Sequence, residues 1–154
     1  MKYFIKKIRS KNISNSYIET INHKSTKDFI AFAKKGKKKK TKKDLEKYLA
    51  DLPKDEVLYG VYKNSIHVAN FKIKIKKNKA YIGFLVFIKY QGKGIVQRVF
   101  NKILKLGILR KNKIRFMYLG VDKKNIRAIK LYKKLGFKYQ KNSQKIMYIN
   151  INKI

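Results

Sequence analysis

The stretch LGVDKKNIRAIKLYKKLGF, residues 119–137, joins the end of an apolar segment to a helical pattern. The preceding residues, KIRFMYLGV (113–121), are predicted to form a strand, and apolar side chains then recur at helical spacing over 125–137. Asn125 suits a helix N-cap, and Gly136 suits the position just past a helix C-terminus. The stretch therefore predicts a strand followed directly by a capped helix.

A second junction of this kind lies upstream in KYQGKGIVQRVF, residues 89–100. The apolar run at 80–89 is typical of a central strand covered on both faces, and a helical pattern runs from Gly94 to about Arg110. A helix start presents free N–H groups at the positive end of its dipole, and glycine lets a phosphate approach them. Gly92 and Gly94 therefore indicate a phosphate site. The alternative is that they are present only because the chain turns here.

The rest of the chain shows no repeat and no linker. Alternating patterns predict further strands at 2–8, 56–63, 66–75 and 145–151. Helical patterns, with Ser14, Ser25 and Thr41 as caps and Asp28 completing a capping box with Ser25, predict helices at 14–22, 25–33 and 41–52. The lysine run at 34–43 is expected to be a solvated loop, or alternatively a flap over an anionic substrate. The expected class is α+β: one domain over 1–154 with a mixed, mostly antiparallel central sheet flanked by helices.

The charge is +34, from 42 Lys and Arg against 8 Asp and Glu. One interpretation is a nucleic-acid partner; the other is an AT-rich genome, whose codons favour Lys, Ile, Asn, Tyr and Phe. Arg is the residue preferred for base and phosphate forks, and it is rare here beside Lys, so nucleic acid is not expected as a specific partner.

The chain has no Cys, which excludes disulfides and thiolate metal sites, and no metal is expected. It shows no apolar segment long enough for a signal peptide or a membrane span. The expected protein is cytoplasmic, without a membrane partner, and a monomer or homodimer.

Taken together, the two junctions resemble motifs A and B of the GCN5-related N-acetyltransferase (GNAT) superfamily. The residues that match motif A, Q/R-x-x-G-x-G/A, are Gln91, Gly92, Lys93, Gly94, Ile95 and, as a departure from Gly or Ala, Val96. Those that match motif B are Leu119, Val121, Asn125, Ala128, Leu131, Tyr132, Lys134, Leu135, Gly136 and Phe137. The segments 16–22 and 67–73 are similar to the ribosomal-protein-alanine-acetyltransferase-like branch, although Thr20 stands where Trp is usual.

The resemblance implies transfer of an acetyl group from acetyl-CoA to a primary amine. The pyrophosphate of CoA would lie on the N–H groups from Gly92 to Gln97, and the pantetheine arm would run along 84–88. A backbone N–H between Phe84 and Val86 would polarise the thioester carbonyl. The resemblance further assigns a hydrogen bond to pantetheine to Asn125 and protonation of the leaving thiolate to Tyr132. From the residues alone, Asn125 could equally be an N-cap and Tyr132 ordinary core.

The general base is the least defined part of this assignment. No carboxylate lies between Val57 and Val121, and His67 and His23 are the two histidines able to accept a proton through water. A weakly basic α-amino group, of pKa ~7.7–8.0 against ~10.4 for Lys, needs less help from a base. An amino sugar or a protein N-terminus is therefore expected as the acceptor. Because 8 carboxylates among 42 Lys and Arg disfavour a site for a polycation, the expected acceptor is a small, anionic amine such as an amino-sugar nucleotide. The alternatives are a basic nucleic-acid- or ribosome-associated protein and an inactive CoA-binding relative.

Overall fold

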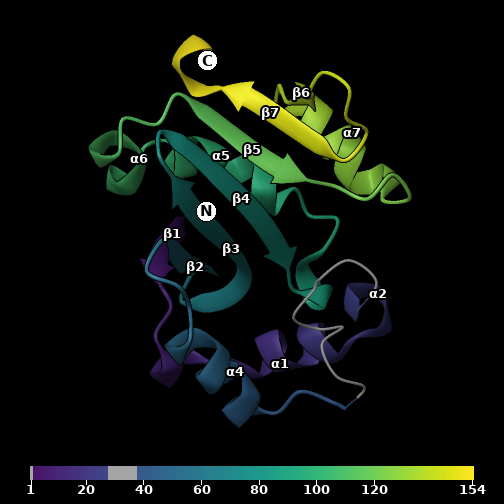
Figure 1. The fold of residues 1–154 in the computed structure, drawn as a ribbon. Coiled ribbons are helices and arrows are strands. Elements are labelled where there is room, and N and C mark those ends of the chain that lie inside the picture. Colours follow the sequence, from purple (N-terminus) through teal and green to yellow (C-terminus); the bar gives the residue numbers. More distant parts are fainter. Residues whose placement is uncertain (1, 28–37) are drawn as a thin grey trace. The chain divides into compact units, whose positions relative to one another are not determined.

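The sheet of this protein has seven strands in the order β1-β2-β3-β4-β5-β7-β6, in a computed structural model that describes residues 2–27 and 38–154 (Figure 1). The strands are β1 (Tyr3–Lys7), β2 (Glu56–Lys63), β3 (Ile66–Lys76), β4 (Lys79–Val86), β5 (Phe116–Gly120), β6 (Lys138–Tyr139) and β7 (Ile146–Asn150). β4 and β5 are parallel, whereas β1 and β2, β5 and β7, and β6 and β7 are antiparallel. The predicted mixed, mostly antiparallel α+β fold is confirmed.

The helices begin where the sequence supplies caps. They are α1 (Asn15–Asn22), α2 (Lys24–Lys27), α4 (Lys42–Ala50), α5 (Ile95–Leu104), α6 (Gly107–Lys111) and α7 (Ile126–Lys134). Ser14 caps α1 by accepting from the N–H of Tyr17, and Thr41 forms the predicted capping box with Asp44 at α4. Ser25 lies inside α2 instead of capping it. Its predicted partner Asp28, the rest of the 25–33 helix and residues 34–37 of the lysine run fall outside the described residues.

By its contacts the chain divides into two compact units, with β3 and β4 continuing through both. The first unit contains residues 1–71 and 85–95, and the second contains 72–84 and 96–154. The first unit is built on a cluster of buried residues from α1, α4, β2 and the segments between elements: Ile8, Ile13, Tyr17, Ile21, Leu45, Leu58 and Phe87. About 25 cal/mol per Å² of apolar surface removed from water makes such a cluster the main source of stability.

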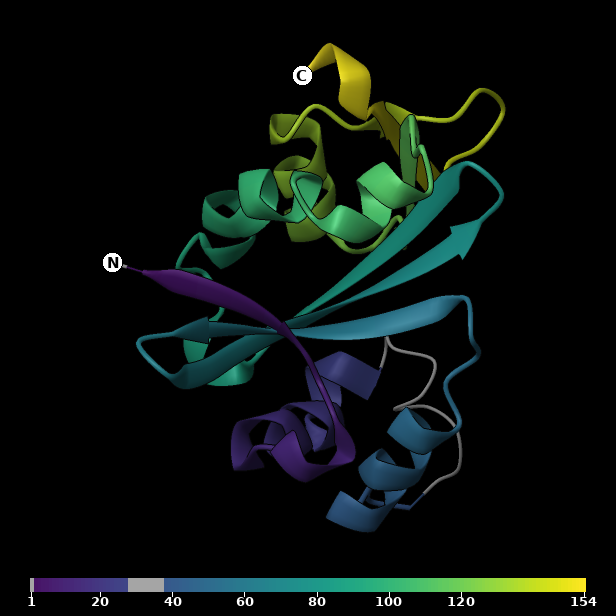
Figure 2. The same cartoon turned by 90° about the vertical axis from the view of Figure 1, so that its left-hand side faces the viewer.

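In the second unit the helices α5, α6 and α7 lie on one side of β4, β5 and β7 (Figures 1 and 2). The buried residues alternate along these strands: Ala80, Ile82, Met117, Leu119, Met147 and Ile149. The prediction that the 80–89 strand is covered on both faces is wrong for its first half, because Lys79, Tyr81 and Gly83 are exposed. That strand carries apolar residues on an open face.

Several helices and strands are shorter than the sequence predicts. β4 ends at Val86 and not at Lys89, because a 3-10 turn, η2 (Ile88–Tyr90), follows and the Ile88 N–H donates to the Thr20 side chain and not to a strand. The single helix expected over 94–110 is two, α5 and α6, because Leu106 adopts an extended conformation between them. β5 is shorter than 113–121, since Lys113 has a φ of 52°.

Candidate functional site

The glycine turn before α5 has the backbone that motif A requires. Gly92 and Gly94 adopt φ values of 76° and 69°, a region that residues with a Cβ rarely occupy, and α5 begins at the next residue, Ile95. The Gln91 side chain donates from Nε2 to the Val86 carbonyl over 3.0 Å. This hydrogen bond joins two predicted site residues, Val86 at the end of β4 and Gln91 in the turn.

The segment that leads into the turn is anchored to α1. The Ile88 N–H donates to Oγ1 of Thr20 over 3.1 Å, and Thr20 is almost fully buried. The Phe87 ring stacks on the Tyr17 ring at 5.7 Å between centroids. Thr20 replaces a Trp of the family pattern, and its hydroxyl supplies a polar anchor that no feature of the sequence predicted.

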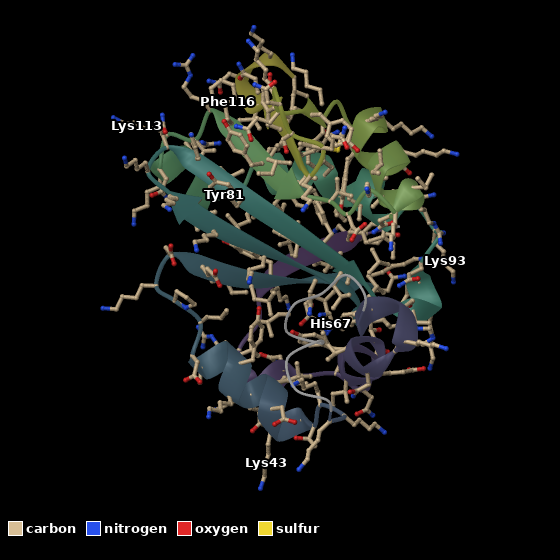
Figure 3. The ribbon with its side chains drawn as sticks, turned by 45° about the vertical axis from the view of Figure 1, so that its right-hand side comes forward. Lys43, His67, Tyr81, Lys93, Lys113 and Phe116 are labelled. Carbon is tan, nitrogen blue, oxygen red and sulfur yellow. The ribbon has the colours of Figure 1, made fainter. Side chains whose placement is uncertain are left out.

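The first residues of α5 separate a buried side from an open one. Ile95 and Val96 are buried, whereas Gln97 is exposed. The side chain of Val96, which departs from the family pattern, is thus packed within protein and does not cover the exposed first turn. Lys93 is exposed, and its Nζ lies 5.6 Å from the centre of the Tyr90 ring (Figure 3). The turn combines backbone N–H groups with a positive charge, which suits an anion.

Tyr132 lies on α7 with its ring largely buried. Its ring centre is 6.2 Å from that of Phe84 on β4 and 6.0 Å from that of Phe137. Burial raises the pKa of Tyr132 to about 12, because the phenolate would lose its hydration. The hydroxyl therefore stays protonated at neutral pH, which is the state that an acid needs. The structure brings together two predicted site residues, Phe84 and Tyr132, from β4 and α7.

Asn125 is the N-cap of α7. Its Oδ1 accepts from the Ala128 N–H over 3.2 Å, so the N-cap interpretation is confirmed. This bond uses the Asn125 amide oxygen, and the amide nitrogen takes no part in the cap. The loop before it is held by Asp122, whose carbonyl accepts from the Asn125 N–H and whose Oδ1 accepts from the Lys124 N–H. The predicted contact of Asn125 with pantetheine stays a prediction.

His67 is not placed as a base. Its Nδ1 lies 2.9 Å from Ser14 Oγ and its Nε2 lies 2.6 Å from Asn70 Oδ1, so both ring nitrogens have partners (Figure 3). The ring is buried, stacks on Tyr62 at 4.6 Å and meets Phe87 edge-on. Burial lowers its pKa, against the opposing effect of the Asn70 bond. These contacts argue against the predicted role of His67 and give it a structural one.

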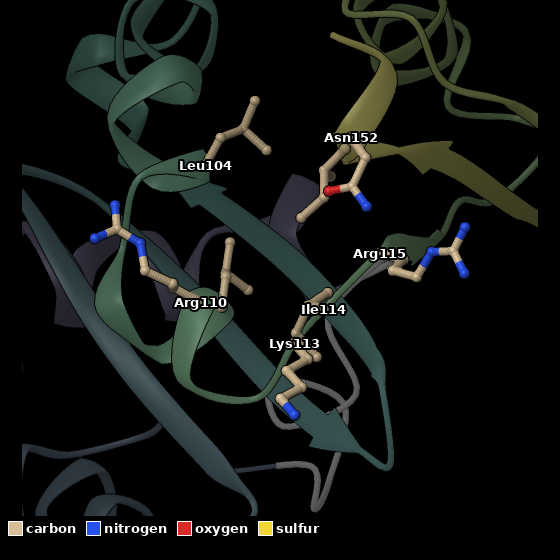
Figure 4. A pocket seen from close by; sticks show the side chains of 8 residues that line it. Leu104, Arg110, Lys113, Ile114, Arg115 and Asn152 are labelled. Atoms are coloured by element: carbon tan, nitrogen blue, oxygen red, sulfur yellow. The ribbon is translucent and has the colours of Figure 1, made fainter.

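A surface pocket of about 420 Å³ lies in the second unit, and none of the predicted site residues lines it (Figure 4). It is lined by Leu104, Leu109, Arg110, Lys113, Ile114, Arg115, Ile151 and Asn152. The charged ends of Arg110, Lys113 and Arg115 point away from one another, so they do not converge on one bound group. The pocket brings no acid and base together and is not assigned to catalysis.

Metal binding and membrane insertion can be considered for residues 2–27 and 38–154. Among them, no cluster of three or more His, Asp or Glu side chains has the arrangement of a metal site. None of their helices combines the length and the apolar character that crossing a membrane requires.

The comparisons with known proteins agree with this architecture. The family model described as acetyltransferase (GNAT) family matches residues 15–137. PaiA N-acetyltransferase from Thermoplasma acidophilum, solved with coenzyme A, is 22% identical, with a TM-score of 0.73 over 97% of this chain and 99% of that chain. Campylobacter jejuni N-acetyltransferase PseH, solved with acetyl coenzyme A, is 19% identical, with a TM-score of 0.64 over 96% and 99%. Aminoglycoside acetyltransferase AAC(6′)-Ib, solved with coenzyme A, is 14% identical, with a TM-score of 0.76 over 97% and 95%. None of the curated sequences compared with the chain matches it.

Proposed function

The chain belongs to the acetyltransferase (GNAT) family, and we propose that it transfers the acetyl group of acetyl-CoA to the primary amine of a small, anionic acceptor. The observation that carries the proposal is the turn at Gly92 and Gly94, where both glycines have positive φ and a helix begins at once. Such a turn is built to let a phosphate reach backbone N–H groups.

The residues of the turn fit the pyrophosphate of CoA. A Cβ at Gly92 or Gly94 would strain the backbone in the conformation that it adopts, so the turn itself favours glycine at both positions. The first four N–H groups of any α-helix have no partner within the helix, and those of α5 follow directly. We assign the N–H groups from Gly92 to Gln97 to the pyrophosphate, with Lys93 adding charge.

The reacting end is assigned to β4 and α7. The bound substrate supplies an activated acetyl thioester. A backbone N–H between Phe84 and Val86 donates to its carbonyl oxygen, where negative charge develops. Tyr132, which is protonated at neutral pH, donates its proton to the leaving thiolate, and the Asn125 amide nitrogen holds the pantetheine arm.

The acceptor follows from charge. The acidic side chains of the described residues are Glu19, Asp44, Glu46, Asp51, Asp55, Glu56 and Asp122, and none of them is buried. A polycationic acceptor, such as that in the name of the aminoglycoside acetyltransferase, needs a site lined by carboxylates. An anionic amine, such as an amino-sugar nucleotide, suits the lysine-rich surface better; a protein N-terminus is the second expectation. Membership of the ribosomal-protein-alanine-acetyltransferase-like branch stays a prediction.

No side chain is assigned as general base. His67 is held in a buried network, and the region from Val57 to Val121 has no carboxylate. An acceptor whose amine has a pKa near ~8 has a substantial neutral fraction at neutral pH, so it can attack without a strong base. The expected acceptor is therefore a weakly basic amine as well as an anionic one.

A screen of amine acceptors, followed by the release of free CoA, tests the proposal. Amino-sugar nucleotides, α-amino peptides, spermidine and aminoglycosides are compared against CoA release without acceptor. The proposal requires turnover with an anionic or α-amino acceptor above that background. Turnover with polycations alone would contradict the acceptor class. Saturable binding of acetyl-CoA without turnover of any acceptor would indicate the inactive, CoA-binding relative.

A further inference from the structure

Three tyrosines form a straight row across the open face of the second unit. Tyr81 on β4 stands directly opposite Tyr118 on β5, which stands directly opposite Tyr148 on β7. The ring centres are 5.4 Å and 5.9 Å apart, and both pairs are stacked. We call these three residues the aromatic row. Neighbouring strands are about 4.8 Å apart, so the register itself aligns the rings.

Two lysines lie against rings of the aromatic row. Lys138 on β6 is the register partner of Tyr148, and its Nζ lies 5.5 Å from the centre of that ring. Lys79 on β4 places its Nζ 5.5 Å from the centre of the Tyr118 ring. Both lysines are exposed, and both ammonium groups lie against aromatic rings. The face thus offers aromatic surface and positive charge side by side.

The row lies on the face opposite to the helices of its unit. Ala80, Ile82 and Met117 alternate with the row along the same strands and are buried, whereas α5, α6 and α7 lie on their side (Figures 1 and 2). Tyr81 is 37% exposed, Tyr118 and Tyr148 are half-buried, and Figure 3 shows Tyr81 on the sheet. A contiguous aromatic surface on an open sheet face is a candidate binding surface.

The charge of this unit restricts what can bind there. Asp122 is the one acidic residue in 72–84 and 96–154, although this unit is rich in lysine. A second copy of the chain, docked through the same face, would bring Lys79 and Lys138 against its own positive surface. The partner that complements the face is anionic and carries flat apolar groups.

We propose that the aromatic row binds single-stranded nucleic acid. Unpaired bases pack against the exposed Tyr81 ring and the half-buried rings of Tyr118 and Tyr148 beside it irrespective of sequence, and the phosphates between the bases pair with Lys79 and Lys138. A duplex has its bases already stacked and cannot use the rings. This surface is separate from the residues assigned to acetyl-CoA, so acetyl-CoA binding is independent of it.

Fluorescence anisotropy with labelled uridine and thymidine oligomers of about 12 nucleotides tests the proposal, with a duplex of equal length as the competitor. The test variant is Tyr81→Thr with Tyr118→Thr, because threonine is well tolerated in strands. The matched aromatic control is Tyr139→Thr, which removes a tyrosine that has a Lys133 ammonium over its ring and stands opposite the buried Met147. The charge variant is Lys79→Ala with Lys138→Ala. Its matched control is Lys102→Ala with Lys105→Ala, which removes two exposed lysines, one at the end of α5 and one just after it.

The proposal expects the double tyrosine variant to bind single strands at least about tenfold more weakly, with acetyl-CoA binding and thermal stability near those of the parent. Tyr139→Thr should change affinity little, and Lys79→Ala with Lys138→Ala should weaken binding more than the α5 pair. Unchanged affinity in the tyrosine variant, or equal affinity for duplex, would overturn the proposal. So would a parent dimer that the same variant dissociates, since a second copy would then be the occupant.

Discussion

The ring of Tyr132 lies 6.2 Å from the ring of Phe84, which places the one buried tyrosine of α7 beside the last part of β4. In the proposed reaction the strand supplies an N–H to the thioester and the tyrosine supplies a proton to the thiolate. Phe84 and Tyr132 both belong to the second unit. Their contact also explains why the phenol is buried, and hence why its pKa is raised to about 12.

Tyr132→Phe should lower kcat by roughly 10²–10⁴-fold and leave acetyl-CoA affinity near normal. The phenylalanine ring keeps the packing against Phe84 and Phe137, so only the proton donor is lost. Because the pKa of Tyr132 is about 12, the parent should show no loss of kcat from this group below about pH 10. Steady-state kinetics over pH give both results. Unchanged turnover in the variant would remove Tyr132 from the acid role.

Gly94→Ala should weaken acetyl-CoA binding, because a Cβ at a φ of 69° costs roughly 1–2 kcal/mol and shifts the N–H groups of the turn. Gly107→Ala is the control. A Cβ at Gly107 meets no atom within 4 Å, and the residue opens α6, where alanine is favourable. Titration calorimetry and thermal melting separate the two effects. Equal acetyl-CoA affinity in both variants would show that the turn does not hold the pyrophosphate.

Asn125→Ser separates the two roles considered for this residue. Serine is as good an N-cap as asparagine, so the stability of α7 should be kept, whereas Asn125→Ala should lose about 1 kcal/mol. If the amide nitrogen holds pantetheine, both variants should bind acetyl-CoA more weakly. Parent-like acetyl-CoA affinity in Asn125→Ser would leave the residue as a cap alone.

The buried His67 should make folding stability fall with acid. Its pKa is lowered in the folded protein, so the unfolded chain takes up a proton first, near pH 6.5, and stability is lost as the pH falls through that value. Denaturant unfolding between about pH 7.5 and about pH 5.5 should show this loss in the parent and a smaller one in His67→Gln. Parallel pH profiles for the two proteins would show that His67 is not responsible.

The two strand-to-helix junctions could be predicted from the sequence because their information is local. The N-cap at Asn125, the glycines of the turn and Gly136, which has a φ of 103° after α7, are each set by a few neighbouring residues. The capping box of Thr41 and Asp44 is another such case. The family resemblance then connected the junctions to one activity.

Long-range contacts could not be predicted in this way. The bond from the Ile88 N–H to Thr20 joins residues 68 apart, and the pairing of His67 with Ser14 joins residues 53 apart. His67 was proposed as a base because its buried partners are invisible in the sequence. The register that aligns Tyr81, Tyr118 and Tyr148 is equally non-local. The sequence offered only the net charge, which suggested nucleic acid, and the scarcity of Arg beside Lys, which favoured genome composition as its cause.

Calorimetric titration of acetyl-CoA into the parent protein tests most directly the central claim that the protein binds acetyl-CoA at the glycine turn. The account predicts saturable binding of one acetyl-CoA per chain, weakened in Gly94→Ala and kept in Gly107→Ala. No heat of binding and no thermal shift at millimolar acetyl-CoA would contradict it.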